Sequence, residues 1–107
     1  RNNWFPTEIL DDERYTERSI DRLAVHARRA MYEYAPTLRA PSEPMYRVVH
    51  WGPLLDLFLL DGRTYRSPNE PPPDRAPESN PPFLGAAQAS WLLDALSTSR
   101  AVWKVIA

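Results

Sequence analysis

Cysteine is absent from the 107-residue chain. Disulfides, thiolate nucleophiles, iron–sulfur clusters and cysteine-ligated zinc sites are therefore excluded within it. Glycine is also scarce, with 3 residues against 12 prolines. Long apolar runs are missing as well: the longest, residues 54–60, contains Asp56. A membrane-spanning helix needs roughly 20 consecutive apolar residues, so the sequence predicts no membrane span.

An excess of charge of one sign is also missing. The 13 Lys and Arg residues nearly balance 14 Asp and Glu residues, which gives a formal net charge of −1. Nucleic-acid binding through bulk electrostatics requires a clear basic excess, so we expect no partner of that class. The length fits one domain or a piece of one. Residues 102–107 are strand-like with no turn after them, so we expect residues 1–107 to be an incomplete segment of one domain. The alternative is a complete small domain.

The spacing of apolar residues predicts two helices. The first covers residues 16–35, with Thr16 as N-cap and an end imposed by Pro36. The second covers residues 85–97, with Trp91 as its largest apolar side chain. The face of the first helix that we expect in a core comprises Ile20, Leu23, Ala24, Ala27, Ala30, Met31 and Tyr34.

Three strands are predicted from β-branched and aromatic runs. Residues 45–51 and 54–60 flank the turn signal Gly52-Pro53, which indicates an antiparallel hairpin. The nearly continuous apolarity of residues 54–60 predicts burial on both faces. Residues 101–106 form a third strand, parallel to residues 54–60 because a helix connects the two. The fold class is therefore mixed α/β, in the order helix, β-hairpin, long loop, helix, strand.

The long loop is proline-rich. Residues 67–82 contain seven prolines and no large apolar residue, a composition that cannot build a core. A loop of this length is usually functional or disordered. One hypothesis for the whole chain is therefore a small, non-catalytic α/β binding module that presents residues 68–82 to a protein groove for extended proline helices.

Catalytic motifs are few. The two histidines, His26 and His50, are not spaced as a metal pair, and the sequence contains no HExxH, GxSxG or P-loop pattern. We therefore predict a structural role for each histidine. Asn3 has a side-chain oxygen of the kind that binds hard cations such as Ca²⁺, although most loop asparagines only shape turns.

Residues 61–66 carry the strongest candidate site, because they follow the end of a buried strand, where ligands gather in open α/β sheets. Asp61 is a candidate to bind a metal or to orient Arg63. Arg63 or Arg66 would hold a phosphate oxygen through its planar set of donors. The alternative is a surface Asp–Arg pair, which contributes about 0–1 kcal/mol.

Four stretches of the chain, in the same order and at similar spacing, together resemble the PhoD-like alkaline phosphatases. The stretches are Arg29-Ala30-Met31-Tyr32-Glu33-Tyr34-Ala35-Pro36; Tyr46-Arg47 with Trp51-Gly52 and Leu59-Leu60-Asp61-Gly62-Arg63-Thr64-Tyr65-Arg66; Leu84-Gly85 with Gln88 and Trp91-Leu92; and Trp103-Lys104-Val105-Ile106. Asn2-Asn3-Trp4 also fits, since it follows an Asp-Asp-His-Glu motif in that family. The chain departs from the family pattern at Gly62, where Thr is frequent, and at Pro53, where Asp is common.

The resemblance implies a metallophosphoesterase with a central β-sandwich flanked by helices. It implies hydrolysis of phosphate mono- and diesters by a metal-bound hydroxide, with iron and calcium as cofactors, in an exported (periplasmic or extracellular) enzyme. Most metal ligands would lie outside this chain, in the rest of the parent protein, so residues 1–107 alone would be inactive. Within the chain we predict Arg63 as the catalytic residue, through phosphate contact or orientation of Asp61. Asn3 and Asp61 are predicted at the metal site, and a turn-shaping role for Asn3 stays open.

Overall fold

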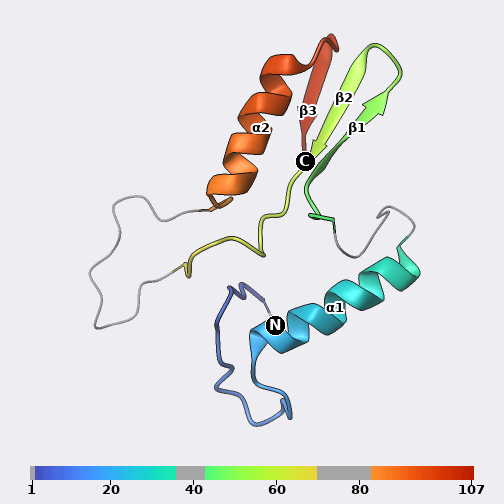
Figure 1. Ribbon diagram of the computed structural model, residues 1–107. Helices are drawn as coiled ribbons and strands as arrows, with labels where there is room; N and C mark the ends of the chain where they lie inside the picture. Colours follow the sequence, from blue (N-terminus) through green and yellow to red (C-terminus); the bar gives the residue numbers. More distant parts are fainter. Residues whose placement is uncertain (1, 36–42, 70–82) are drawn as a thin grey trace. The chain divides into compact units, whose positions relative to one another are not determined.

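The structure of the chain, a computed structural model, describes residues 2–35, 43–69 and 83–107. Its elements are α1 (Ile20–Tyr34), β1 (Arg47–Trp51), β2 (Leu55–Leu59), α2 (Ala86–Thr98) and β3 (Trp103–Ile106), shown in Figure 1. This order confirms the mixed α/β class. The chain divides into two compact units, residues 1–43 with 67–81 and residues 44–66 with 82–107. Most of the proline-rich segment 67–82 lies outside the described residues.

In the first unit, α1 begins four residues later than predicted. An isolated antiparallel bridge pairs Ile9 with Ser19, and the Ile20 N–H donates to the Glu8 carbonyl at 3.0 Å. These contacts hold the chain extended through Ser19, which is the N-cap in place of Thr16. The predicted start was wrong because this pairing is not local, and helical periodicity does not report it.

The apolar face of α1 is only partly buried. Ile20 is buried, whereas Ala27, Ala30 and Met31 are exposed, and Tyr34 is 85% exposed. The prediction that the whole face lies in a core was therefore wrong. The physical reason is that the first unit has a single described helix, whose apolar contact with the preceding loop lies toward its N-terminal end. A shallow depression of about 310 Å³ marks this contact, and it is lined by Trp4, Tyr15, Ile20, Leu23, Ala24 and Ala27.

The second unit contains a three-stranded sheet in the order β1-β2-β3. The first pair is antiparallel, with Val49 opposite Leu57, and the second is parallel, with Leu57 opposite Val105. Both predicted pairings are confirmed. Gly52 lies in the hairpin turn at φ 65°, a left-handed conformation that suits glycine.

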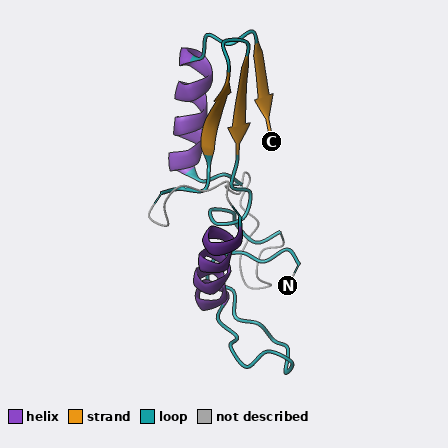
Figure 2. Cartoon of the chain, turned by 90° about the vertical axis from the view of Figure 1, so that its right-hand side faces the viewer, coloured by secondary structure: helices purple, strands orange, loops and turns teal. Residues whose placement is uncertain are grey.

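Helix α2 lies beside this sheet and runs opposite to β2 and β3, as Figures 1 and 2 show. Asp56 and Phe58, two residues apart on β2, are buried, while Leu55, Leu57 and Leu59 are only half-buried. Alternate strand residues point to opposite faces, so one face of β2 is covered and the other is not. Burial on both faces was thus a wrong prediction: among the described residues, one helix covers one face.

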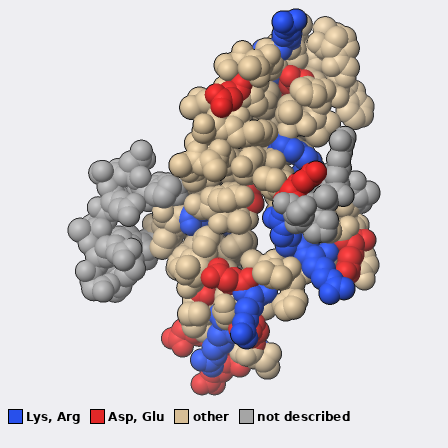
Figure 3. All heavy atoms as spheres, in the orientation of Figure 1, with Lys and Arg blue, Asp and Glu red and all other residues tan. Residues whose placement is uncertain are grey.

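The exposed surface of this unit is strongly apolar. All four residues of β3 are exposed, with Trp103 at 68%. On the face drawn in Figure 3, basic and acidic side chains are intermingled and not gathered by sign. In the segments 2–35, 43–69 and 83–107, no helix combines the length and apolarity required to cross a membrane.

Candidate functional site

The candidate site is the turn of residues 61–66, which we call the Asp61 turn and which follows β2. Asp61 is buried, with 7% of its surface exposed. Its Oδ1 atom accepts hydrogen bonds from the backbone N–H groups of Arg63 at 3.0 Å and Thr64 at 2.9 Å. An aspartate that binds the backbone two and three residues ahead closes a local turn. Asp61 therefore fixes the backbone that carries Arg63.

The other carboxylate oxygen of Asp61 has a different environment. Oδ2 is buried and makes no hydrogen bond within the described part of the chain. A buried carboxylate oxygen without a partner is energetically costly unless something else binds it. The surface alternative for this turn was therefore wrong with respect to Asp61. One anionic oxygen is left to bind a cation or a hydrogen-bond donor.

Gln88, in the first turn of α2, joins the helix to the Asp61 turn. The Asp61 N–H donates to Gln88 Oε1 at 2.7 Å, and Gln88 Nε2 donates to the Asp61 carbonyl at 2.9 Å. The second Nε2 hydrogen reaches the Leu84 carbonyl at 2.9 Å. Gln88 is completely buried. The amide thus satisfies both backbone groups of Asp61.

Aromatic packing holds the rest of the turn. The Tyr46 ring lies 5.9 Å from the ring of Tyr65, edge to face, and 4.8 Å from the ring of Trp91 on α2. Gly85, the N-cap of α2, lies directly against Tyr65. This contact requires a residue without a side chain. Trp91, the largest apolar side chain of the predicted second helix, thus packs on Tyr46.

The predicted site residues lie in different units. Asp61 and Arg63 are brought together in the second unit, and Arg63 is half-buried. Asn3 lies in the first unit, where it is exposed at φ 55° and its N–H donates to Asn2 Oδ1 at 3.1 Å. These features fit the turn-shaping interpretation of Asn3, and its role at a metal site stays a prediction.

A metal cage is not assembled by the residues that the structure describes. Nowhere among them do three or more His, Asp or Glu side chains lie close enough together to hold a metal ion. In the Asp61 turn, the atom that fits a cation is Asp61 Oδ2, which is buried and makes no hydrogen bond to these residues. Carboxylate oxygen is a preferred ligand of hard cations.

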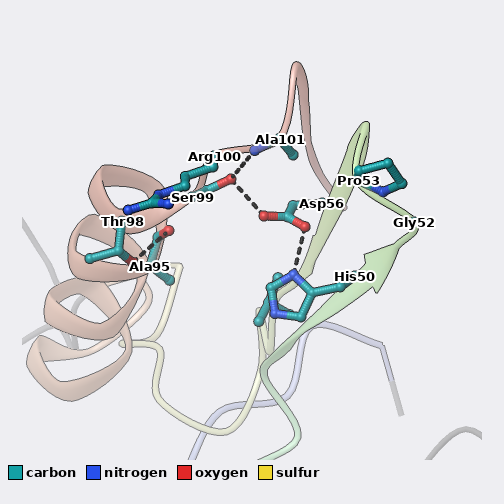
Figure 4. Close-up of a pocket in the computed structure, with 10 residues that line it drawn as sticks. His50, Gly52, Pro53, Asp56, Ala95, Thr98, Ser99, Arg100 and Ala101 are labelled. Carbon is teal, nitrogen blue, oxygen red and sulfur yellow. Dashed lines mark hydrogen bonds and ion pairs between the residues drawn. The ribbon is translucent and has the colours of Figure 1, made fainter.

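A second polar cluster lies at the other end of β2 and α2 (Figure 4). It consists of His50, Asp56 and Ser99, and we call it the Asp56 cluster. Asp56 Oδ1 lies 2.6 Å from His50 Nδ1, and Asp56 Oδ2 accepts from the Ser99 hydroxyl at 2.6 Å. These residues border a cleft of about 360 Å³. The ring of His50 is turned toward Asp56, which confirms a structural contact for this histidine.

The order of groups in the Asp56 cluster does not match a nucleophilic triad. In such a triad a base lies between the hydroxyl and the carboxylate, whereas in this cluster the carboxylate lies between Ser99 and His50. The hydrogen bond from Ser99, and next that from His50, holds the pKa of Asp56 below its usual value. A carboxylate stabilised in its charged form is a poor proton acceptor. The cluster therefore fastens β1, β2 and the end of α2 together.

Sequence reasoning missed two of these arrangements. The pairing of His50 with Asp56 was available in principle, because the hairpin register places them opposite each other. Gln88 was named only within a stretch that resembles the family, without a structural role. Its bond to Asp61 spans 27 residues of sequence, and a polar residue on an otherwise apolar helix face was a signal that could have identified it.

Comparison with known proteins identifies the family of the chain. The profile of one family, PhoD-like phosphatase, matches residues 1–107. A similar curated protein is alkaline phosphatase D of Bacillus subtilis (strain 168), 37% identical over an alignment of 93 residues that covers 76% of this chain. The chain spans only 16% of the length of that relative. No solved structure matches the chain. Since the family match covers every residue, the chain belongs to the PhoD-like phosphatase family.

Proposed function

We propose that this chain forms one segment of a phosphate ester hydrolase and that the Asp61 turn contributes to its active site. The family match and the relative named alkaline phosphatase D support the reaction class. The observation that carries the site assignment is the buried, unpartnered Oδ2 of Asp61, in the same turn as Arg63. Buried polar atoms without a partner are few in folded proteins, and a bound ion is one of the explanations for such an atom.

The two side chains have different roles in this proposal. Arg63 binds a nonbridging oxygen of the phosphate ester, because a guanidinium group offers two parallel donors to such an oxyanion. Asp61 holds the Arg63 backbone through Oδ1 and presents Oδ2 to a cation. Iron and calcium, as the resemblance implies, would supply Lewis-acid stabilisation of charge on the phosphoryl group. We propose that most of their ligands come from outside this chain; the role of Asn3, in the first unit, as a metal ligand stays a prediction.

The proposal of a binding module has less support. Most of its proline-rich segment, residues 68–82, lies outside the described residues, and the family match covers the whole chain. A phosphatase segment explains both the match and the buried carboxylate of Asp61.

The test is Arg63→Ala in the full-length protein, assayed with a nitrophenyl phosphodiester. Loss of one charge-stabilising donor lowers turnover by about 10²–10³-fold in comparable sites. Arg100→Ala is the matched control, because Arg100 is an exposed arginine at the opposite end of α2. We expect normal circular dichroism for both variants and normal turnover for Arg100→Ala alone. Unchanged turnover in a folded Arg63→Ala protein would remove Arg63 from the site.

A further inference from the structure

We propose that Gln88 is a positioning residue of the enzyme, which sets the orientation of the Asp61 turn through its side-chain amide. The inference rests on the proposed function of that turn. It adds a residue from a different element, α2, which touches the backbone of Asp61 and not the reacting groups. Gln88 would therefore affect turnover through Asp61 and Arg63.

The first step of the argument is the hydrogen bonding at the end of β2. The strand pairs with β3 through Phe58, and the Leu60 N–H still reaches the carbonyl of Ala107 at 2.8 Å. At Asp61 the side-chain amide of Gln88 replaces β3 as the hydrogen-bond partner of the backbone, donating to the carbonyl and accepting from the N–H. A primary amide presents a donor and an acceptor side by side. It therefore serves Asp61 as a neighbouring strand would.

The second step concerns the rigidity of Gln88 itself. Its side chain has no exposed surface, and both Nε2 hydrogens are used, one by Asp61 and one by the Leu84 carbonyl four residues earlier. The bond to Leu84 fixes the rotation of the amide plane, since each hydrogen has its own acceptor. Because burial and the bond to Leu84 hold the Gln88 amide in place, the amide can orient the backbone of Asp61.

The third step follows the constraint to the candidate site. With its backbone fixed on both sides, Asp61 directs its carboxylate in one direction, where Oδ1 closes the turn onto Arg63 and Thr64. Oδ2 on the same carboxylate is left without a hydrogen bond from the described residues. Rotation of the Asp61 backbone would move Oδ2 and the Arg63 side chain together. Misplacement of reacting groups by about 1 Å costs up to about 10²-fold in rate.

The substitutions separate orientation from general destabilisation. Gln88→Met keeps the length and burial but removes all three hydrogen bonds. Gln88→Glu places a carboxylate oxygen against the carbonyls of Asp61 and Leu84 when it is ionised, whereas its protonated form can again donate to Asp61 and accept from it. Ser99→Ala is the matched control: in the Asp56 cluster, at the other end of α2, it removes the partly buried hydrogen bond to Asp56 and the longer one from the Ala101 N–H.

The experiment compares these variants in the full-length protein. Steady-state kinetics with a nitrophenyl phosphodiester are measured over a range of pH, and backbone amide exchange is followed at Arg63 and Thr64. We expect Gln88→Met to lower kcat/KM by about 10–10²-fold and to accelerate exchange at both amides. Ser99→Ala should change neither by more than its loss of stability explains. The activity of Gln88→Glu relative to the parent should rise as pH falls.

A double-mutant cycle gives the deciding measurement. If Gln88 acts through the turn, Gln88→Met will lower turnover much less in an Arg63→Ala background than alone, because the group that it positions is already absent. Full additivity of the two substitutions overturns the proposal. Parental activity in Gln88→Met also overturns it if Asp61→Asn and Arg63→Ala are impaired. Both outcomes leave the proposed function of the turn intact. If Asp61→Asn and Arg63→Ala are themselves fully active, the proposed function of the turn fails and the role of Gln88 falls with it.

Discussion

The three glycines of the chain form a natural series for testing the packing of the Asp61 turn. Gly85 has φ 74° and ψ 156°, a region of backbone space open essentially to glycine alone. A Cβ atom at this position would lie 2.9 Å from Tyr65 Cβ. Because Tyr65 Cβ is attached directly to the backbone, a side-chain rotation cannot relieve this contact. Gly85→Ala therefore combines a backbone penalty with a steric one.

The other two glycines separate these contributions. Gly52 also has a positive φ, 65°, but a Cβ there would meet nothing within 4 Å. Gly62 has no such φ, and its Cβ would make an ordinary contact of 3.8 Å with the Phe83 ring. We expect a backbone cost of about 1–2 kcal/mol for Gly52→Ala and nearly none for Gly62→Ala. Gly85→Ala should cost about 2–6 kcal/mol, as the backbone and overpacking penalties combine.

The assay is the urea midpoint of the full-length protein together with amide exchange in α2, so that local opening is detected even if unfolding is not two-state. The ranking Gly85→Ala, Gly52→Ala, Gly62→Ala is the essential result. Equal effects of Gly85→Ala and Gly52→Ala would show that Tyr65 does not pack against the start of α2, which would refute the tight contact between Gly85 and the Asp61 turn. Faster exchange at Arg63 in Gly85→Ala would connect this packing to the candidate site.

Two further outcomes concern acid stability and association. The pKa of Asp56 is held below its usual value by the hydrogen bond from Ser99 first and that from His50 next. The contribution of Asp56 to folding stability is therefore complete above the ordinary aspartate pKa of about 3.9 and is lost as pH falls through the pKa of the folded state. Ser99→Ala should flatten the dependence of the urea midpoint on pH in that acid range, and an unchanged dependence would contradict the assignment. The exposed apolar residues of β3 predict self-association of residues 1–107 in sedimentation velocity when they are produced alone. Val105→Lys should weaken the association, whereas Val25→Lys, at an exposed position of α1, should not. If the unmodified residues 1–107 stay monomeric, the predicted self-association is refuted.

Local patterns were sufficient to predict the strand pairing of the second unit. The hairpin followed from β-branched and aromatic runs on either side of Gly52, and the parallel pairing of β3 followed from the helix that precedes it. Each of these signals lies within a few residues of the feature that it predicts. The sequence also located the Asp61 turn, because a turn after an apolar strand is a local feature too.

The failures came from contacts between distant residues. The pairing of Ile9 with Ser19 delays the start of α1. The hydrogen bond between Gln88 and Asp61 joins residues that are 27 positions apart in the sequence. Burial was overestimated for α1 and β2 for a related reason. An apolar pattern reports that a face is suited to burial, but it does not report which neighbour covers it. Tyr34 is exposed in the first unit although its position in the helical pattern is correct.

The two polar contacts of α2 together explain how the second unit holds its candidate site. Gln88 bonds to Asp61 near the start of the helix, and Ser99 bonds to Asp56 at its end. The helix rises about 16.5 Å over the eleven residues from Gln88 to Ser99. The strand and its continuation advance about 16.5 Å over the five residues from Asp56 to Asp61. Since the two distances along the helix and the strand agree, the Gln88–Asp61 and Ser99–Asp56 bonds form without stretching either element. The helix therefore fixes the position at which β2 ends and the Asp61 turn begins.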